Sequence, residues 1–538
     1  MKSRDRIFVN GKIYQTPFVS PVDAIRIRKG KILCLGSFSD VLCGPGNSEI
    51  VNLEGATVLP GFIDSHNHMM TYGLMKKQFN CRALEDRNSR LLKRKLREYA
   101  FSCEGSSWVL GYNFNESHVD EFPDKSFLDS IIPDRPVLLV RSCTHSALLN
   151  SRALEILFPN ALFENPKNGR MGRRSSGEPD GWLYEEALEE ALVRIHSMDS
   201  AGVFRALKSA QEDYLALGLT GVHDPGTDMI SKKGYVGYYL DFEKRGLLKI
   251  RTYLMSRISS SAPITTWLYE VKRLEDEKTE RGSLLRLGGV KLFADGSIGS
   301  RTAALSAPYE GSAENRGLLK NMDELKGQME KIHKARMQIV VHAIGDLAVS
   351  EITRCFGEIL EAYPFRDHRH RIEHAEMCDV QVIREMKRLG LLVTVQPSFI
   401  HDFGDDYRKG LGPERAARLI RCRDFLEECL SFSIGTDAPI SSPSPWENIW
   451  AAMVRKTKGG IPLGLNQSIS LAHALDAYTA QAAFAGFHEN ECGSLSPGKE
   501  ADMAIFEENP FLLSPEELPG LKVKYTVLSG NVVYAKDS

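Results

Sequence analysis

Two histidines, two residues apart, follow an apolar run near the start of the chain. The segment VLPGFIDSHNH ends with His66 and His68. Residues i and i+2 of a strand point to the same side, so both imidazoles can reach one ion. An HxH pair is common by chance, but its place at the end of an apolar run, after Pro60-Gly61, favours a metal-binding pair.

A lysine stands inside the apolar run of LGGVKLFADGS, at position 291. A buried lysine is costly unless its charge is paired or removed. One interpretation of Lys291 is an ammonium paired with a nearby carboxylate such as Asp295. The other is a neutral amine that has captured carbon dioxide as a carbamate, whose two oxygens could bridge two cations. The residue alone favours the ion pair.

Three more polar residues end apolar runs: His342 in MQIVVHAIGD, His374 in RHRIEHAE and Asp437 in FSIGTDAP. One such histidine is usually a packing residue, but three in similar places are less easily explained by chance. Imidazoles and carboxylates together suit zinc, manganese or iron(II), and the sequence does not decide among them. We therefore expect a divalent metal site of one or two ions.

Other residues are weaker candidates for the site. His223 in GVHDPG is expected to lie behind the metal ligands or to face the substrate, and His145 in RSCTHSALLN to reach the substrate. Asp295 is expected to be a loop carboxylate that shapes the mouth of the site. The remaining histidines are interpreted as surface or packing residues; they include positions 333, 368, 370, 401, 473 and 488.

The elements that must position these residues form an alternating pattern. Apolar, β-branched runs alternate with helix-like stretches, which is typical of βα units around a parallel sheet. Eight such runs predict an α/β fold built on a (β/α)8 TIM-type barrel, whose active site lies at the carboxyl ends of the strands. The runs are 58–63, 221–223, 250–255, 287–293, 338–341, 370–372, 392–395 and 431–434.

Two features depart from the barrel pattern. About 150 residues separate the first two runs, which is too long for a crossover and predicts an inserted α/β domain at 71–214. Both ends of the chain look rich in short strands, with hairpin signals at Asn10-Gly11 and Gly530-Asn531. We expect 1–57 and 490–538 to form one composite β-sandwich, and 58–70 with 215–489 to form the barrel.

Bulk composition excludes several classes of protein. The 538 residues include 68 basic and 70 acidic side chains, a formal net charge of −2, and no basic run typical of nucleic-acid binding. No apolar stretch reaches the roughly 18 residues that span a bilayer. The N-terminus has charges where a signal peptide needs an apolar core, and the ten cysteines are scattered. We expect a cytoplasmic protein with free thiols.

Several phrases resemble one known family. The order HxH, Lys, His, His, Asp is similar to the amidohydrolase superfamily. The segments GFIDSHNH, KLFADGSIGSRTAAL, VVHAIGD, RIEHAE, SIGTDAP and GSLSPGKEADMAIF resemble its branch of YtcJ-like proteins and N-substituted formamide deformylases. The resemblance covers essentially the whole chain.

The resemblance changes the interpretation of Lys291, because in the family this lysine is typically carboxylated and bridges two metals. It implies that His66, His68 and Asp437 bind one ion, and that His342 and His374 bind the second; zinc is the expected metal. In the insertion, RSCTHSALLNSRAL resembles a family run that ends in a shared histidine and asparagine, here His145 and Asn150. Both are expected to line a substrate pocket.

The implied reaction is hydrolysis of a non-peptide C–N bond in an amide-type, small-molecule substrate. Metal-activated hydroxide would attack the carbonyl, with Asp437 as general base and then general acid. An ester or lactone hydrolase, a deaminase, and a non-catalytic barrel that only binds metal are the alternatives. A homodimer is implied by the resemblance alone.

Overall fold

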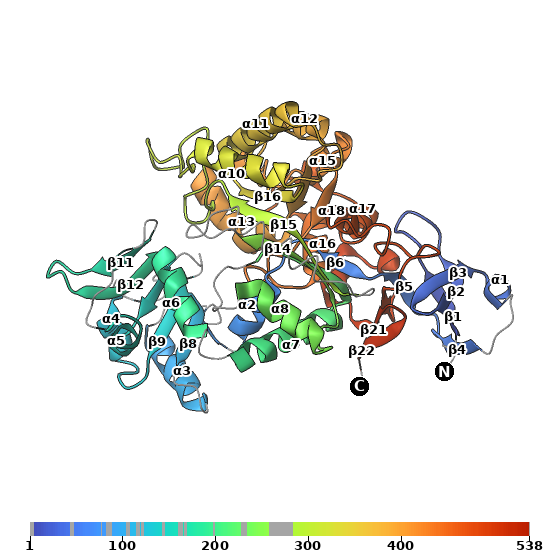
Figure 1. Cartoon of the computed structure of the whole chain (residues 1–538), viewed down its shortest axis with the longest axis horizontal. Helices are drawn as coiled ribbons and strands as arrows, with labels where there is room; N and C mark the ends of the chain where they lie inside the picture. Colours follow the sequence, from blue (N-terminus) through green and yellow to red (C-terminus); the bar gives the residue numbers. More distant parts are fainter. Residues whose placement is uncertain are drawn as a thin grey trace. The chain divides into compact units, whose positions relative to one another are not determined.

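The computed structural model describes residues 5–42, 48–76, 78–81, 89–103, 108–114, 119, 123–141, 146–159, 165, 169–196, 200–226, 234–257 and 283–536. It divides into two compact units. Unit 1 comprises Met1–Met69, Gln211–Asp228 and Tyr239–Ser538, and unit 2 comprises Met70–Ala210 and Met229–Tyr238. Figure 1 labels their elements.

Unit 1 contains a nearly closed barrel of eight parallel strands. Neighbours pair in chain order, and the Ser65 amide donates to the Ile434 carbonyl between the first and last strands. The order of strands and intervening helices confirms the predicted (β/α)8 TIM-type barrel. The strands are β6 (Phe62–Asp64), β13 (Leu219–Asp224), β14 (Arg251–Arg257), β15 (Leu285–Phe293), β16 (Gln338–Ala343), β17 (Arg371–His374), β18 (Leu392–Val395) and β19 (Phe432–Ile434).

The barrel helices follow the predicted spacing of apolar residues. In α11 the buried side chains recur every three or four residues, from Ala348 to Ile359, so that one face covers the sheet. Helices around and after the strands are α7 (Ser200–Ala216), α8 (Gly234–Lys244), α10 (Met322–Lys334), α11 (Asp346–Ala362), α12 (Val380–Leu389), α13 (Ser398–Leu411), α14 (Pro413–Ala416), α15 (Cys422–Glu427), α16 (Pro445–Val454), α17 (Leu471–Ala477) and α18 (Ala480–Ala485).

The two ends of the chain share one β-sheet, as expected. Its order is β22-β21-β20-β5-β1-β2-β3, with β4 also paired to β1, so β5 and β20 join the N- and C-terminal parts. The strands are β1 (Asp5–Ile13), β2 (Val22–Arg28), β3 (Lys31–Gly36), β4 (Ser48–Asn52), β5 (Thr57–Pro60), β20 (Met503–Phe506), β21 (Val523–Leu528) and β22 (Asn531–Ala535). Both ends of the chain thus contribute strands to a single sheet.

Two expectations about local structure were wrong. Asn10-Gly11 is not a hairpin turn, because β1 runs through it; there β1 changes its partner from β4 to β5. The apolar run 58–63 is not one strand: β5 belongs to the terminal sheet and β6 to the barrel, with the break at Gly61. A Cβ on Gly61 would lie 2.2 Å from Thr220 Oγ1, so this crossing point requires glycine.

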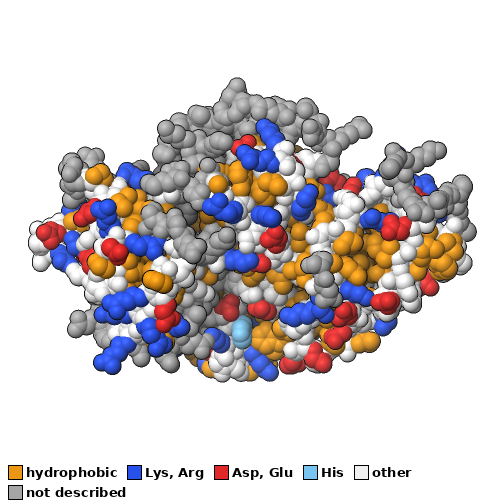
Figure 2. Space-filling model, turned by 90° about the horizontal axis from the view of Figure 1, so that it is seen from below, with side chains coloured by type: hydrophobic (Ala, Val, Ile, Leu, Met, Phe, Trp, Pro, Cys, Tyr) orange, Lys and Arg blue, Asp and Glu red, His pale blue; other side chains and the backbone are white. Residues whose placement is uncertain are grey.

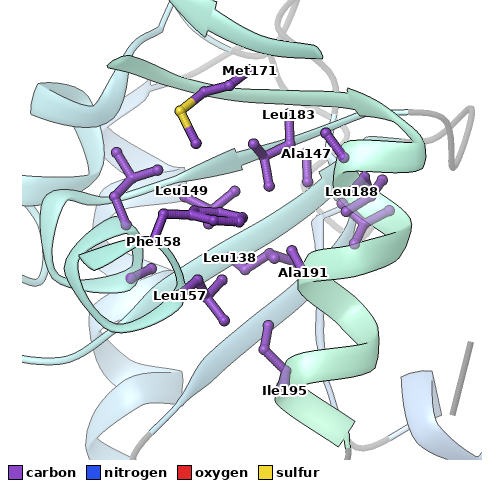
Figure 3. Packing of buried hydrophobic residues seen from close by; sticks show 14 residues of the cluster. Leu138, Ala147, Leu149, Leu157, Phe158, Met171, Leu183, Leu188, Ala191 and Ile195 are labelled. Atoms are coloured by element: carbon purple, nitrogen blue, oxygen red, sulfur yellow. The ribbon is translucent and has the colours of Figure 1, made fainter. Parts of the chain in front are cut away.

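Unit 2 is an α/β insertion with helices on both faces of a six-stranded sheet. Along β9, Leu138 and Val140 belong to the core that includes α5 and α6, and Figure 3 shows this cluster. Val137 and Leu139 belong to the opposite core, with α3. Its elements are β7 (Phe79–Asn80), α3 (Ser89–Ser102), β8 (Val109–Phe114), α4 (Lys125–Asp129), β9 (Val137–Arg141), β10 (Ser146–Leu149), α5 (Ser151–Leu157), β11 (Gly169–Arg173), β12 (Pro179–Glu185) and α6 (Glu186–His196).

The described surface carries charges of both signs. Figure 2 shows Lys and Arg interspersed with Asp and Glu on one face, in line with the near-neutral formal charge. Among the described helices, none combines the length and the apolar character that crossing a membrane requires.

Candidate metal centre

Three residues from different strands converge at the carboxyl end of the barrel. One ligand atom each from His66, His374 and Asp437 lie within 4.8 Å of one another, and all three residues are buried. Asp437 Oδ1 lies 3.5 Å from His66 Nε2 and 3.1 Å from His68 Nε2. Residues after β6, in β17 and after β19 thus form a group that could hold a metal ion.

The other predicted ligands lie beside this group. The ring centroids of His342 and His374 are 4.5 Å apart, and those of His374 and His66 are 4.9 Å apart. Lys291 is 2% exposed. Burial lowers the pKa of Lys291 to about 8, although the charges of Glu373 and Asp437 oppose this shift. Loss of the proton from Lys291 is therefore easier in the fold than in water.

The hydrogen bonds of the histidines suit metal ligation. His66 Nδ1 bonds to Glu373 Oε2, His374 Nδ1 to Gln396 Oε1 at 2.8 Å, and His342 Nε2 to the Gly296 carbonyl at 3.1 Å. Each partner accepts, so each of these nitrogens carries the hydrogen and the other ring nitrogen offers its lone pair. Burial also holds the pKa of His66 and His374 well below the usual range, which favours the neutral form a cation needs.

Glu373 and Arg371 support this centre, and the sequence analysis did not identify them. Both side chains are fully buried, and Arg371 Nε donates to Glu373 Oε1 at 2.9 Å. Arg371 also donates to the Ser65 carbonyl and to the Thr394 hydroxyl. The sequence RIEH could have indicated them. Arg371 and Glu373 are two residues apart in a short buried strand, and buried opposite charges are stable only when they are paired.

The backbone has an unusual conformation at the converging residues. φ is +74° at His374, +41° at Ala375 and +56° at Asp437. Non-glycine residues rarely adopt positive φ, and such conformations cluster at functional sites. The turn at His374 breaks strand alternation, so that Glu373 and His374, although adjacent, both lie against His66.

Asp64 fastens the first strand of the barrel to the last. Its carboxylate accepts the amides of Thr436 at 2.9 Å and of His66 at 3.2 Å, and the side-chain amide of Asn67 at 2.8 Å. Burial raises the pKa of Asp64 to about 6 despite these bonds. The contacts fix the segments that carry His66 and Asp437 relative to each other.

Asp295 and His223 lie close to the predicted ligands. The Asp295 carboxylate accepts three backbone amides, from Ala304, Ile344 and Gly345, and so joins the segments after β15 and β16. It lies 3.6 Å from His342 Nε2. His223 Nδ1 lies 3.1 Å from the Arg371 guanidinium, and the His223 carbonyl accepts the backbone amide of Asn67, next to His66.

The insertion residues are a different case. Asn150 Oδ1 accepts the amides of Val137 and Ala153, and its Nδ2 donates to the carbonyls of Ile132 and Arg135. These four bonds use the full capacity of the amide and cap α5. We therefore assign Asn150 a structural role and do not propose it as a substrate-binding residue. His145 lies outside the described residues.

Comparison with known proteins identifies several relatives over nearly the full length. The chain is 35% identical to protein LONG AFTER FAR-RED 3 of Arabidopsis thaliana over 94% of this chain and 87% of that protein. It is 30% identical to the putative amidohydrolase YtcJ of Bacillus subtilis strain 168, over 96% of both chains. It is 26% identical to N-substituted formamide deformylase of Arthrobacter pascens, over 99% of both chains.

A solved structure and a family profile indicate the same family as these relatives. An uncharacterized metal-dependent hydrolase from Pyrococcus horikoshii OT3 superposes with a TM-score of 0.77 at 26% identity, covering 96% of this chain and 99% of that one. The profile of the amidohydrolase family matches residues 49–534. The chain therefore belongs to the amidohydrolase family, in the branch that includes YtcJ and N-substituted formamide deformylase.

Proposed function

We propose that this amidohydrolase cleaves a non-peptide C–N bond in a small amide-type substrate. The observation that carries the proposal is the convergence of His66, His374 and Asp437 at the barrel mouth, beside the buried Lys291. Neutral imidazoles, a carboxylate and a lysine amine form a donor set that suits a divalent metal better than any structural role.

In this proposal His66, His68 and Asp437 hold one ion, and His342 and His374 hold a second. Lys291 would complete the site as a carbamate: its amine would add to carbon dioxide and lose a proton, and the carbamate oxygens would then serve as metal ligands. Zinc is the proposed metal. Once bound, a divalent metal lowers the pKa of a bound water and polarises the carbonyl of the substrate.

Asp437 is the proposed proton carrier. Its carboxylate is buried and lies within 3.5 Å of the lone-pair nitrogen of His66. In the reaction it accepts a proton from the attacking water and passes it to the leaving amine nitrogen, so that the C–N bond breaks without an unstable amide anion. Arg371 and Glu373 keep the His66 ring in place meanwhile.

The first test combines metal analysis with a substrate panel. The purified chain, loaded with zinc, is assayed against formamides, N-acyl amino acids, lactones and aminated heterocycles, before and after chelation. We expect bound metal and chelator-sensitive hydrolysis of amides. Turnover of lactones or aminated heterocycles alone would replace the C–N proposal with an esterase or deaminase. Bound metal without any turnover would indicate a binding barrel.

The second test is the substitution Asp437→Asn. It keeps the size of the side chain but removes the base, so kcat should fall by about 100-fold or more while the fold is retained. Asp406→Asn is the matched control, because that carboxylate is 73% exposed on α13 and pairs only with Lys409 in the described contacts. Activity near that of the wild type in Asp437→Asn would exclude the proton-carrier role.

We also propose that the protein is cytoplasmic and forms a homodimer. Support for a reducing compartment comes from the cysteines of the described residues, which are free thiols and mostly buried. Cell fractionation tests the location, and light scattering of the purified chain tests the dimer.

A further inference from the structure

A buried carboxyl group lies just past the end of β17. Glu376 is 1% exposed, and neither of its side-chain oxygens has a hydrogen-bond partner among the residues that the structure describes. Its neighbours at this end of the barrel differ, because Asp64, Asp295 and Glu373 all accept hydrogen bonds. A buried carboxylate without donors is costly, so its retention needs an explanation.

The surroundings of Glu376 are acidic. Burial raises the pKa of its carboxyl to about 8, and the negative charges of Asp295 and Asp437 act in the same direction. The buried Tyr407 hydroxyl of α13 lies beside the carboxylate and lowers this pKa, but it is not in hydrogen-bonding geometry. Asp402, on the same helix, lies close enough to Tyr407 to raise the pKa of that phenol.

We propose that Glu376 binds a basic nitrogen of the substrate, an amino or guanidino group, next to the reacting amide. An ammonium or guanidinium group supplies the N–H donors that both side-chain oxygens lack, and its positive charge stabilises the ionised form of Glu376. Charge-assisted hydrogen bonds of this kind are strong, and a site built for a donor discriminates against analogues without it. The inference rests on the proposed function, since it selects cationic amides as the substrates.

A binding experiment tests the inference without any turnover. Calorimetry measures the affinity of the zinc-loaded full chain for n-butylammonium and for n-butanol, which have similar shapes. The wild type should prefer the cation by about tenfold or more, and Glu376→Gln should lose that preference. Glu385→Gln, an exposed site on α12, should keep it. Equal affinities in the wild type, or a preference that survives in Glu376→Gln, would overturn the inference.

A kinetic experiment separates this inference from the proposed function. The mono-N-formyl derivative of diaminopropane and N-butylformamide differ mainly in the terminal charge. The kcat/KM ratio of the first to the second should be about ten or more in the wild type and near one in Glu376→Gln. If neither amide is cleaved but the binding preference holds, the proposed reaction fails and the cation site stands. If Glu376→Gln does not fold, Glu376→Asp replaces it in both experiments. This variant withdraws the carboxylate by one methylene and should lose most of the preference for the cationic compounds.

Discussion

Replacing Glu373 with glutamine tests whether the buried chain from Arg371 through Glu373 to His66 orients a metal ligand. One carboxylate oxygen accepts from His66 Nδ1 and the other from Arg371 Nε. Both Glu373 and Arg371 are fully buried, so water does not screen their charges. Glutamine keeps the shape and one acceptor, but its NH2 group faces a donor in place of the second acceptor.

The expected magnitude has two parts. Breaking a buried ion pair costs about 3–5 kcal/mol, and here the lower end applies because Arg371 keeps its bonds to Ser65 and Thr394. Loss of the acceptor that orients a ligating histidine typically reduces metal affinity about 10–100-fold. That factor corresponds to about 1.4–2.7 kcal/mol of binding free energy, separate from the loss in folding free energy.

Two measurements separate these parts. Urea unfolding of the metal-free protein reports the folding free energy, and competition with a chelator reports the dissociation constant for zinc. Glu385→Gln is the control: its pair with Arg388 is exposed, so stability should change by less than about 1 kcal/mol. If Glu373→Gln loses stability but binds zinc as tightly as the wild type, Glu373 only neutralises Arg371 and does not orient His66.

Three further perturbations follow from the structure. Gly435→Ala should lower the free energy of unfolding by about 1–3 kcal/mol and weaken zinc binding, because the new Cβ would lie 2.4 Å from the His66 backbone nitrogen. Gly299→Ala is the control, since a Cβ there would have nothing within 4 Å. Unfolding and zinc titrations of this control should match those of the wild type. Asn150→Ala should lower the free energy of unfolding in urea by about 2 kcal/mol or more, because it removes four hydrogen bonds within the insertion. It should leave KM unchanged; a raised KM would indicate that Asn150 binds the substrate after all. Burial lowers the pKa of His370 well below 6.5, so its imidazole stays neutral in the folded protein and its contribution to stability should be lost as the pH falls below about 6.5. The free energy of unfolding of His370→Gln should therefore fall less at acid pH than that of the wild type. The same pH dependence in both proteins would contradict this reasoning.

Much of the candidate site could be predicted because one rule connects sequence and space in this fold. Carboxyl ends of parallel strands meet at one end of a barrel, so polar residues that end apolar runs are expected to gather there. His66, His374 and Asp437 are far apart in the chain, yet this reasoning places them together, and the structure brings their ligand atoms within 4.8 Å. The barrel and the shared terminal sheet follow from equally repetitive patterns.

What could not be predicted depends on single residues rather than patterns. Hydrophobicity does not mark the change of sheet inside 58–63, because β5 and β6 are both fully buried and only Gly61 separates them. Alternation would place Glu373 and His374 on opposite sides of a strand, and the positive φ at His374 is not readable from its residue type. The family resemblance suggested Asn150 as a pocket residue, and its structural role was not readable because its four partners lie on segments that only the fold brings together.

The polar interior of the barrel is better explained by positioning than by stability. Replacing a buried ion pair with well-packed apolar residues is often neutral or stabilising, so Arg371 and Glu373 are weak candidates for fold stabilisers. Arg371 instead ties Ser65, on the segment that carries His66, to Thr394 of β18, and Glu373 spans the distance to the His66 ring. Each of these contacts restricts where His66 can point, and none is needed to bury apolar surface. A network with that connectivity restricts the orientation of one imidazole, which is what a metal centre assembled from several strands requires.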